Sequence, residues 1–252
     1  MKLKILGSSS KGNCYILETD TGSLILDAGV RFPDIQKALN FDLSKVRGAL
    51  LGHEHGDHSK SFKDLTKAGI DVYLSLGTFQ ALCPGCYPGH RAAIVAPGSQ
   101  FNLLPDSDFT VLPFSVQHDA KEPLGFLIQY KPTGEKLVYL TDSYYSHYAF
   151  TGVNYFLIEC NYCSDILKAN IEAGLIPEVL KNRLLESHFS MENVKGFLEA
   201  NDLSEVRKIV LIHLSDGNSD AARMVREITK LTGKDVEVAE AGKEIELELY
   251  PF

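Results

Sequence analysis

Histidine and aspartate residues are unusually dense between positions 53 and 58 of the chain. His53, His55, Asp57 and His58 fall within six residues, immediately after an apolar run. Neutral imidazole and carboxylate groups are ligands of zinc, manganese and iron, and alternate residues of a tight loop can serve two neighbouring ions. One histidine in such a place would more often be an ordinary surface or core residue. Three histidines beside an aspartate would be costly to bury without a role, so the cluster predicts a metal centre.

The apolar pattern predicts the strands and helices that must hold this cluster. Runs rich in β-branched and aromatic residues predict strands at residues 2–6, 14–18, 23–27, 46–51, 71–75, 109–116, 125–130, 136–140, 155–159, 208–212, 236–238 and 245–249. Apolar residues at helical spacing predict helices at residues 33–40, 61–68, 77–82, 165–174, 177–185, 191–200 and 220–231. The strand at 46–51 delivers the histidine cluster at its end.

The order of these elements predicts the fold class. Strand-rich and helix-rich stretches recur in two rough halves, which favours an α/β protein with two sheets packed face to face and helices on both outer surfaces. This arrangement is a four-layer αβ/βα sandwich. A joint between the halves is expected at residues 102–106, where both flanks remain apolar and patterned. We therefore expect residues 1–252 to form a single domain.

Composition narrows the class of protein. The 252 residues are 44% hydrophobic and 23% charged, which is ordinary for a globular chain with a sizeable core. No apolar stretch has the length of a secretory core or a membrane span, so we expect a soluble, cytoplasmic protein. Five cysteines, an odd number, do not suggest a disulfide framework. The formal net charge of −8 argues against a general basic surface for nucleic acid, although two divalent cations would bring local positive charge.

Residues 53–58 resemble the HxHxDH signature of the metallo-β-lactamase superfamily. The resemblance implies the metallo-β-lactamase fold and a hydrolase that uses two divalent ions, which would be zinc, manganese or iron. Asp27, at the end of a predicted strand, is similar to an early aspartate of the family that orients the histidine loop. His118, Asp142 and His213 each follow a predicted strand, where the family has its third histidine, its bridging aspartate and its last histidine.

This likeness assigns a complete ligand set to the two ions. The first ion would be held by three histidines, the second by an aspartate and two histidines, and a further aspartate would bridge them: His53, His55 and His118; Asp57, His58 and His213; and Asp142. Two ions about 3.5–4 Å apart would trap a bridging hydroxide and clamp the attacking and leaving oxygens during hydrolysis. Asp57 would also steer that hydroxide as a general base.

Longer stretches resemble the WalJ (YycJ) branch of the superfamily. They are residues 7–15, 159–162, 187–190 and 213–218. The branch implies a phosphodiesterase with 5′-to-3′ exonuclease activity on DNA, and it lacks the large nucleic-acid-binding insertion of the β-CASP nucleases. The likeness extends over nearly the whole chain, so it predicts the substrate class as well as the fold.

Two further features each have a functional and an ordinary interpretation. His188 resembles an extra histidine that phosphodiesterase relatives use beside the metals, where it would protonate a leaving oxygen or hold a phosphate. It could instead be a helix-entry histidine bonded to a backbone group; we favour the catalytic role. Residues 8–13 would either hold a phosphate through backbone amides or form only a turn between two strands.

Cysteine spacing raises the possibility of a third metal. Cys83 and Cys86, with His90 close behind, form a CxxC pair that departs from the branch pattern, and Cys160 and Cys163 form a second pair. Two such pairs can build a structural zinc site. The pairs lie far apart in sequence and one falls within an active-site-like stretch, so we favour ordinary thiols.

Three functions fit these features. The leading hypothesis is a metal-dependent phosphodiesterase that acts on DNA, trimming from an end. The second is hydrolysis of a small-molecule ester, thioester, lactone or cyclic phosphodiester on the same dinuclear centre. The third is a metal-binding regulatory module without turnover. The ligand set speaks against this module, because a structural site is usually closed by four ligands, whereas seven shared by two ions leave positions open.

Overall fold

The computed structural model describes the backbone of residues 1–89, 91–103 and 107–249, and the side chains of these residues except 178–181. The chain divides into two compact units. The first comprises Met1–Ser115, Ala120–Glu135 and Glu240–Phe252, and the second comprises Val116–Asp119 and Lys136–Ala239. His90 and residues 104–106 of the expected joint lie outside the described residues. The expectation of a single domain stays a prediction.

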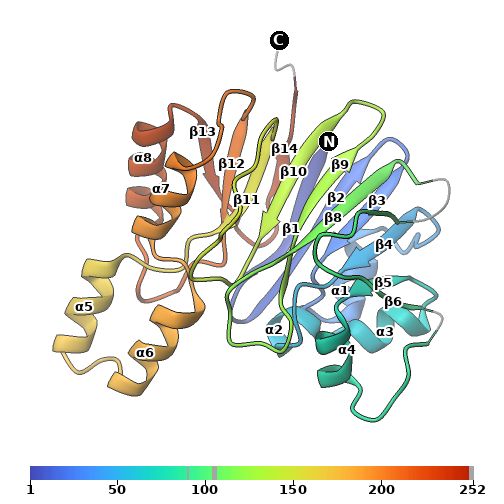
Figure 1. Ribbon diagram of the computed structural model, residues 1–252, viewed down its shortest axis with the longest axis horizontal. Coiled ribbons are helices and arrows are strands. Elements are labelled where there is room, and N and C mark those ends of the chain that lie inside the picture. Colours follow the sequence, from blue (N-terminus) through green and yellow to red (C-terminus); the bar gives the residue numbers. More distant parts are fainter. Residues whose placement is uncertain (90, 104–106, 250–252) are drawn as a thin grey trace. The chain divides into compact units, whose positions relative to one another are not determined.

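A seven-stranded mixed sheet forms the frame of the first unit (Figure 1). Its strands follow the order β14 (Glu244–Glu246), β1 (Lys2–Ser9), β2 (Gly12–Thr19), β3 (Gly22–Leu26), β4 (Val46–Leu50), β5 (Val72–Leu74) and β6 (Ala92–Ile94). Pairing is antiparallel from β14 to β3 and parallel from β3 to β6. The parallel part therefore brings the carboxyl ends of β3 and β4 to the same edge of the sheet, and the histidine cluster follows β4.

Helices and a second group of strands complete the first unit. The helices are α1 (Phe32–Ala38), α2 (Gly56–Ser59), α3 (Phe62–Lys67) and α4 (Leu76–Leu82). The strands β7 (Phe101–Asn102), β8 (Phe109–Ser115) and β9 (Leu124–Tyr130) pair antiparallel. A buried cluster joins Ile25 and Leu74 of the sheet to Ile35 of α1, Leu65 of α3 and Phe79 of α4. Truncating one of these side chains to alanine would cost about 2–5 kcal/mol of folding free energy.

Parallel strands form the centre of the second unit. Strands β10 (Glu135–Leu140), β11 (Tyr155–Glu159), β12 (Lys208–Ile212) and β13 (Asp235–Val238) pair in that order. β11 is buried throughout, as is typical of a strand covered on both faces. Helices α5 (Ser164–Glu172), α6 (Glu178–Ser187) and α7 (Met191–Glu199) lie between β11 and β12 along the chain, and α8 (Ala221–Thr232) lies between β12 and β13. Figure 1 shows α7 and α8 side by side.

Most predicted elements are present, and their ends differ from the prediction by a few residues. The exceptions are short: the sequence did not predict β6, β7 or α2, because two to four residues carry too little periodic pattern. Residues 8–13, one proposed phosphate loop, instead form a β-hairpin in which Ser8 pairs with Asn13 and Ser9 with Gly12. This pairing counts against the phosphate interpretation, because strand pairing leaves few backbone amides for a ligand. No helix in the described part of the chain has the length and apolar character needed to cross a membrane.

Candidate metal-binding residues

Asp27 ties the end of β3 to the histidine cluster in the first unit. The amide of Gly52 donates to Asp27 Oδ1 at 2.8 Å, and His58 Nδ1 donates to Oδ2 at 2.7 Å. Asp27 and His58 are both fully buried. The orienting contact predicted for Asp27 is therefore present, and it leaves Nε2 of His58 as the nitrogen for a metal.

Asn13 supports the opposite side of the His58 ring. Its Nδ2 lies 3.0 Å from His58 Nε2 and 3.0 Å from the carbonyl oxygen of Ser9, while Asp57 Oδ2 lies 3.5 Å from the same ring nitrogen. The amide donor and the Asp27 acceptor both select the ring form with hydrogen on Nδ1 and a lone pair on Nε2, and a metal on Nε2 would take the place of the Asn13 amide. Sequence reasoning placed Asn13 in the candidate phosphate loop at residues 8–13 but gave it no role at His58. The available signal was a polar residue at a strand start that is otherwise apolar.

His53 and His55 direct ring nitrogens at one another. His53 Nε2 lies 3.1 Å from His55 Nδ1, and the ring centroids are 4.7 Å apart. The ring of His53 also lies 4.2 Å from that of His58. Three imidazoles in such proximity, beside the carboxylate of Asp57, form a donor set that suits a divalent cation. The residues of the first unit therefore fit a metal.

Gly29 allows the cluster to pack closely against β3. A Cβ atom at this position would lie 1.6 Å from the carbonyl oxygen of Asp57 and 2.8 Å from the amide nitrogen of Asn13. The neighbouring amide of Ala28 donates to the carbonyl oxygen of His58 at 2.7 Å. The backbone that carries two predicted ligands thus rests directly on a glycine, where any larger residue would displace it.

Three side chains converge after consecutive parallel strands of the second unit. Asp142 follows β10, Glu159 ends β11 and His213 follows β12. His213 Nδ1 lies 2.5 Å from Asp142 Oδ1 and 3.1 Å from Glu159 Oε1, and all three residues are buried. The register of β10, β11 and β12 places their carboxyl ends at one edge, which explains why residues distant in sequence meet.

Left-handed backbone conformations occur at three of the residues that follow strands. The φ angles are 55° at Asp27, 29° at Asp142 and 53° at His213. Non-glycine residues rarely adopt such angles, and each costs on the order of 1–3 kcal/mol. The buried hydrogen bonds of these side chains hold the strained geometry. Strain of this kind concentrates at functional sites, which agrees with a site at the strand ends.

His188 is held by a carboxylate in the second unit. Its Nδ1 lies 2.6 Å from Glu159 Oε1, and the amides of Ser143 and Phe189 donate to the other oxygen of Glu159 at 3.0 and 3.1 Å. The partner of His188 Nδ1 is therefore a carboxylate and not a backbone group. Sequence reasoning included Glu159 in the stretch 159–162 that resembles the branch but gave it no functional role. Its signal was a charged residue ending an otherwise apolar strand.

His118 occupies the same unit and has its own supporting contact. Its Nδ1 donates to the carbonyl oxygen of Ser187 at 2.8 Å, so Nε2 is the nitrogen that faces the carboxylates. Nε2 lies 3.3 Å from Asp119 Oδ1 and 3.7 Å from Asp142 Oδ2. The Ser187 contact fixes the ring orientation that a metal ligand needs. A cavity of about 680 Å³ opens beside it, lined by His118, Asp119, Tyr144, Arg183, Glu186 and Ser187.

Electrostatics in the second unit favour positive charge. Burial alone lowers the pKa of His213, but the adjacent carboxylates of Asp142 and Glu159 outweigh burial and raise it to about 10. The pKa of His188 is raised because Glu159 and Asp142 likewise exceed the effect of burial. Burial instead dominates at His118, whose pKa is lowered. Two buried carboxylates thus attract cations, and a metal could replace the protons on their histidine partners.

Ligand atoms of four residues lie close enough to share one ion. Asp142, Glu159, His188 and His213 each offer an atom within 4.8 Å of the others. This set includes the predicted ligands Asp142 and His213 and adds two residues to which sequence reasoning gave no ligand role. The donor set is that of a divalent-metal site.

None of the five cysteines is joined in a disulfide. All five are free thiols, and no candidate metal cluster among residues 1–89, 91–103 and 107–249 contains a cysteine. Cys160 is fully buried, and burial raises its pKa well above the usual thiol value. The interpretation of the cysteines as ordinary thiols stays a prediction. His90, which follows the first CxxC pair, lies outside the described residues.

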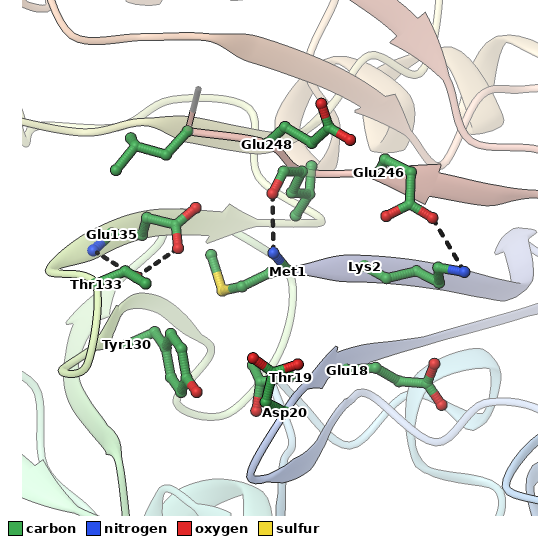
Figure 2. A pocket seen from close by; sticks show the side chains of 12 residues that line it. Met1, Lys2, Glu18, Thr19, Asp20, Tyr130, Thr133, Glu135, Glu246 and Glu248 are labelled. Carbon is green, nitrogen blue, oxygen red and sulfur yellow. Dashed lines mark hydrogen bonds and ion pairs between the residues drawn. The ribbon is translucent and has the colours of Figure 1, made fainter. Parts of the chain in front are cut away.

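A second large cavity lies in the first unit, apart from the cavity beside His118 in the second unit. It has a volume of about 560 Å³ and lies beside the N-terminus, where the amino group of Met1 donates to the carbonyl oxygen of Leu247 at 2.9 Å (Figure 2). Lys2 pairs there with Glu246 at 3.0 Å. No predicted site residue lines this cavity, so it is separate from the candidate metal ligands.

Comparison with known families decides the identity of the fold. A family model described as a beta-lactamase superfamily domain matches residues 24–214. The chain belongs to this superfamily. The matched span contains every predicted metal ligand from His53 to His213. Membership together with the histidine and aspartate clusters makes the chain a metallo-β-lactamase-fold hydrolase with candidate residues for divalent metal binding.

Two relatives of this superfamily member are named as DNA exonucleases. The chain is 29% identical over 238 residues to "Exodeoxyribonuclease YycJ" of Bacillus anthracis, covering 89% of this chain and 87% of the relative. It is 28% identical over 245 residues to "Exodeoxyribonuclease WalJ" of Streptococcus pneumoniae, covering 92% and 86%. The predicted resemblance to the WalJ (YycJ) branch is confirmed.

Solved structures confirm the fold of this superfamily member. The metallo-beta-lactamase fold protein YhfI from Bacillus subtilis has a TM-score of 0.73 at 16% identity, covering 97% of this chain and 99% of that protein. The short form of human tRNase Z has a TM-score of 0.64 at 16% identity, covering 98% and 100%. The α/β sandwich with the metallo-β-lactamase fold, predicted from the sequence, is therefore confirmed.

Proposed function

We propose that the chain is a cytoplasmic, metal-dependent phosphodiesterase that degrades DNA from an end in the 5′-to-3′ direction. The observation that carries this proposal is the set of buried histidines and carboxylates that follow β4, β10 and β12 or end β11. Such a set suits the cleavage of phosphodiesters, whose charged oxygens require cations. The relatives named as exodeoxyribonucleases favour DNA over a small ester as the substrate.

The proposed ligand set remains the one expected from the sequence. His53, His55 and His118 would hold one ion, Asp57, His58 and His213 the other, and Asp142 both. The donor types and the ring orientations set by Asp27 and Ser187 support this assignment. Zinc, manganese and iron all suit such donors. Bound divalent ions would supply water of lowered pKa and would neutralise charge on the phosphate.

Individual side chains at and around these ligands would transfer the protons during hydrolysis or position the groups that do so. Asp57 would accept a proton from the attacking water as a general base. His188 would donate to the leaving oxygen through Nε2, because Glu159 engages Nδ1 at 2.6 Å and so fixes the ring. Glu159 is a positioning residue in this scheme, since it acts through His188 and His213. The amides of Ser143 and Phe189 would keep the Glu159 carboxylate in place.

An assay on end-labelled DNA tests the proposed activity. Purified protein loaded with manganese or zinc is incubated with single-stranded and duplex DNA labelled at either end, and the products are resolved by length. We expect metal-dependent degradation that starts at the 5′ end. Asp57→Ala should lower kcat/KM by a factor of about 30 to 150, equivalent to roughly 2–3 kcal/mol of transition-state stabilisation. No metal-dependent degradation, or full activity in this variant, would contradict the proposal.

His188→Ala separates catalysis from metal binding. The loss of a proton donor should reduce kcat by about 10²- to 10⁴-fold, while the metal content measured by atomic emission stays unchanged. The control is Tyr87→Ala, which alters an exposed residue of the first unit outside the proposed machinery. If His188→Ala loses an equivalent of metal, His188 is a ligand, as its position near Asp142 and His213 also allows.

A further inference from the structure

Residues 143–150 of the second unit form a loop that is rich in aromatic residues. The segment contains Tyr144, Tyr145, His147, Tyr148 and Phe150 and has no helix or strand. It begins directly after Asp142, a proposed metal ligand. Aromatic residues ordinarily concentrate in cores and interfaces, so a cluster of them in a loop requires an explanation beyond connecting two strands.

Hydrogen bonds hold the start of this loop in place. Ser143 Oγ accepts from the amide of Gln117 at 3.1 Å and donates to the carbonyl oxygen of Tyr145 at 2.7 Å. The amide of Tyr144 donates to the carbonyl oxygen of Gln117 at 3.0 Å, and Asn193 Nδ2 donates to the carbonyl oxygen of Tyr144 at 3.1 Å. Contacts from two separate segments and one bond within the loop therefore fix the backbone that presents the rings.

The rings differ sharply in exposure. Phe150 is only 8% exposed and packs 6.3 Å from the ring of Phe197. Tyr145 is 51% exposed and Tyr148 is 42% exposed, and the exposed His147 ring lies 4.8 Å from Tyr145 in an edge-to-face arrangement. The buried ring stabilises the loop, whereas the exposed rings contribute less to the core. Large exposed rings on an anchored loop are typical of a binding surface.

The same loop reaches the cavity beside the proposed metal ligands. Tyr144 lines this cavity of about 680 Å³ together with His118 and Arg183, a volume in the range of ligand sites. The amide of Ser143 donates to Glu159 at 3.0 Å, so the loop also shares a carboxylate with His188. A substrate whose phosphate lay at the proposed catalytic residues of this unit would have its neighbouring nucleotides near the loop.

We infer that Tyr145, His147 and Tyr148 form a stacking platform for the unpaired bases of a single-stranded DNA end. The inference rests on the proposed nuclease function and adds the form of its substrate. Each base has a flat π-face that stacks on an aromatic ring regardless of sequence. Stacking also supplies affinity that does not depend on a general basic surface, against which the net charge of −8 argues. Bases within a duplex are already stacked on each other, so the platform favours unpaired ends.

A binding experiment with abasic DNA tests the platform directly. The metal-loaded full chain is titrated against two fluorescent single-stranded oligonucleotides with uncleavable linkages, one complete and one with abasic sites at its end, and Kd is read by anisotropy. We expect the wild type to bind the complete strand about 10- to 100-fold more tightly, the effect of one or two stacked bases. The double variant Tyr145→Ala/Tyr148→Ala should bind both strands as the wild type binds the abasic one.

Matched variants guard against indirect effects. Tyr145→Phe keeps the ring and should retain the discrimination, and Tyr87→Ala removes a 95% exposed tyrosine elsewhere and should bind as the wild type does. Thermal melting checks that the variants are folded, and Tyr145→Ala alone replaces the double variant if that one unfolds. Equal wild-type affinity for both strands, or discrimination that survives in the alanine variants, would overturn the platform. Degradation without discrimination contradicts only the platform, whereas discrimination without degradation contradicts only the nuclease proposal.

Discussion

His188 Nδ1 lies 2.6 Å from Oε1 of Glu159, the same oxygen that lies 3.1 Å from Nδ1 of His213. One buried carboxylate therefore orients two histidines that come from different segments of the second unit. Backbone amides occupy its other oxygen, so Glu159 cannot turn without breaking several contacts.

Glu159→Gln should reduce catalytic activity strongly and should change the free energy of unfolding comparatively little. The amide keeps the shape of the side chain but removes the charge that orients both imidazoles. We expect kcat to fall by about 10- to 100-fold with a smaller change in KM, as is usual when the partner of a metal-site histidine is altered. Steady-state kinetics on DNA measure this. Raising KM alone would show that Glu159 contributes to binding rather than to positioning.

Asp27→Asn should weaken binding of the ion for which His58 is a proposed ligand. The carboxylate accepts the Nδ1 hydrogen of His58, which keeps the lone pair on Nε2. An asparagine accepts more weakly and can present its amide to the ring, so the metal affinity should fall by about 10- to 100-fold. Competition with a fluorescent chelator gives the affinity. Unchanged affinity for both ions would mean that His58 is not a metal ligand or needs no orientation.

Gly29→Ala should destabilise the fold. The added Cβ would lie 1.6 Å from the carbonyl oxygen of Asp57, so the backbone of α2 must shift. We expect a loss of roughly 3 kcal/mol or more in the free energy of unfolding, at the severe end of single substitutions. Urea denaturation measures it. Gly196→Ala in α7 is the matched control, since its Cβ meets nothing within 4 Å and should stabilise the helix by about 0.5–1 kcal/mol.

Stability should decline at alkaline pH because of the buried thiol of Cys14. Burial, with a smaller contribution from Asp27, raises the pKa of this thiol far above its ordinary value of 9.0. Above about pH 9 the unfolded chain releases the proton while the folded chain retains it, so the free energy of unfolding falls as pH rises, by up to about 1.4 kcal/mol per pH unit.

Denaturation at several pH values checks this dependence. Below about pH 8 both states keep the proton, and Cys14 should contribute no slope. Tyr73 should add to the decline at higher pH, because burial raises its pKa to about 12. Cys14→Ala removes the titrating group and should show a shallower decline than the wild type. An identical slope in this variant would assign the effect to other groups.

Local pattern was sufficient for the regular elements. Strand β11 and helix α8 were predicted closely, because an apolar run and a helical stripe are properties of neighbouring residues. The short helix α2 was not predicted, since it contains four residues of which two are predicted metal ligands and none is apolar. Its geometry depends on contacts with Asn13 and Ala28 from the hairpin and from the end of β3.

The sequence by itself determined which residue types were available for chemistry and indicated the superfamily of the chain. It could do so because a motif such as His53–His58 lies within six consecutive positions and is visible without the fold. The resemblance already implied that Asp27 orients the histidine loop, but only the tertiary structure decided that its partner is His58, that Asn13 contacts the same ring, and that Glu159 contacts both His188 and His213. These pairings depend on strand register and on backbone angles such as the positive φ of Asp142. Such quantities arise from packing between distant segments, so no local pattern records them.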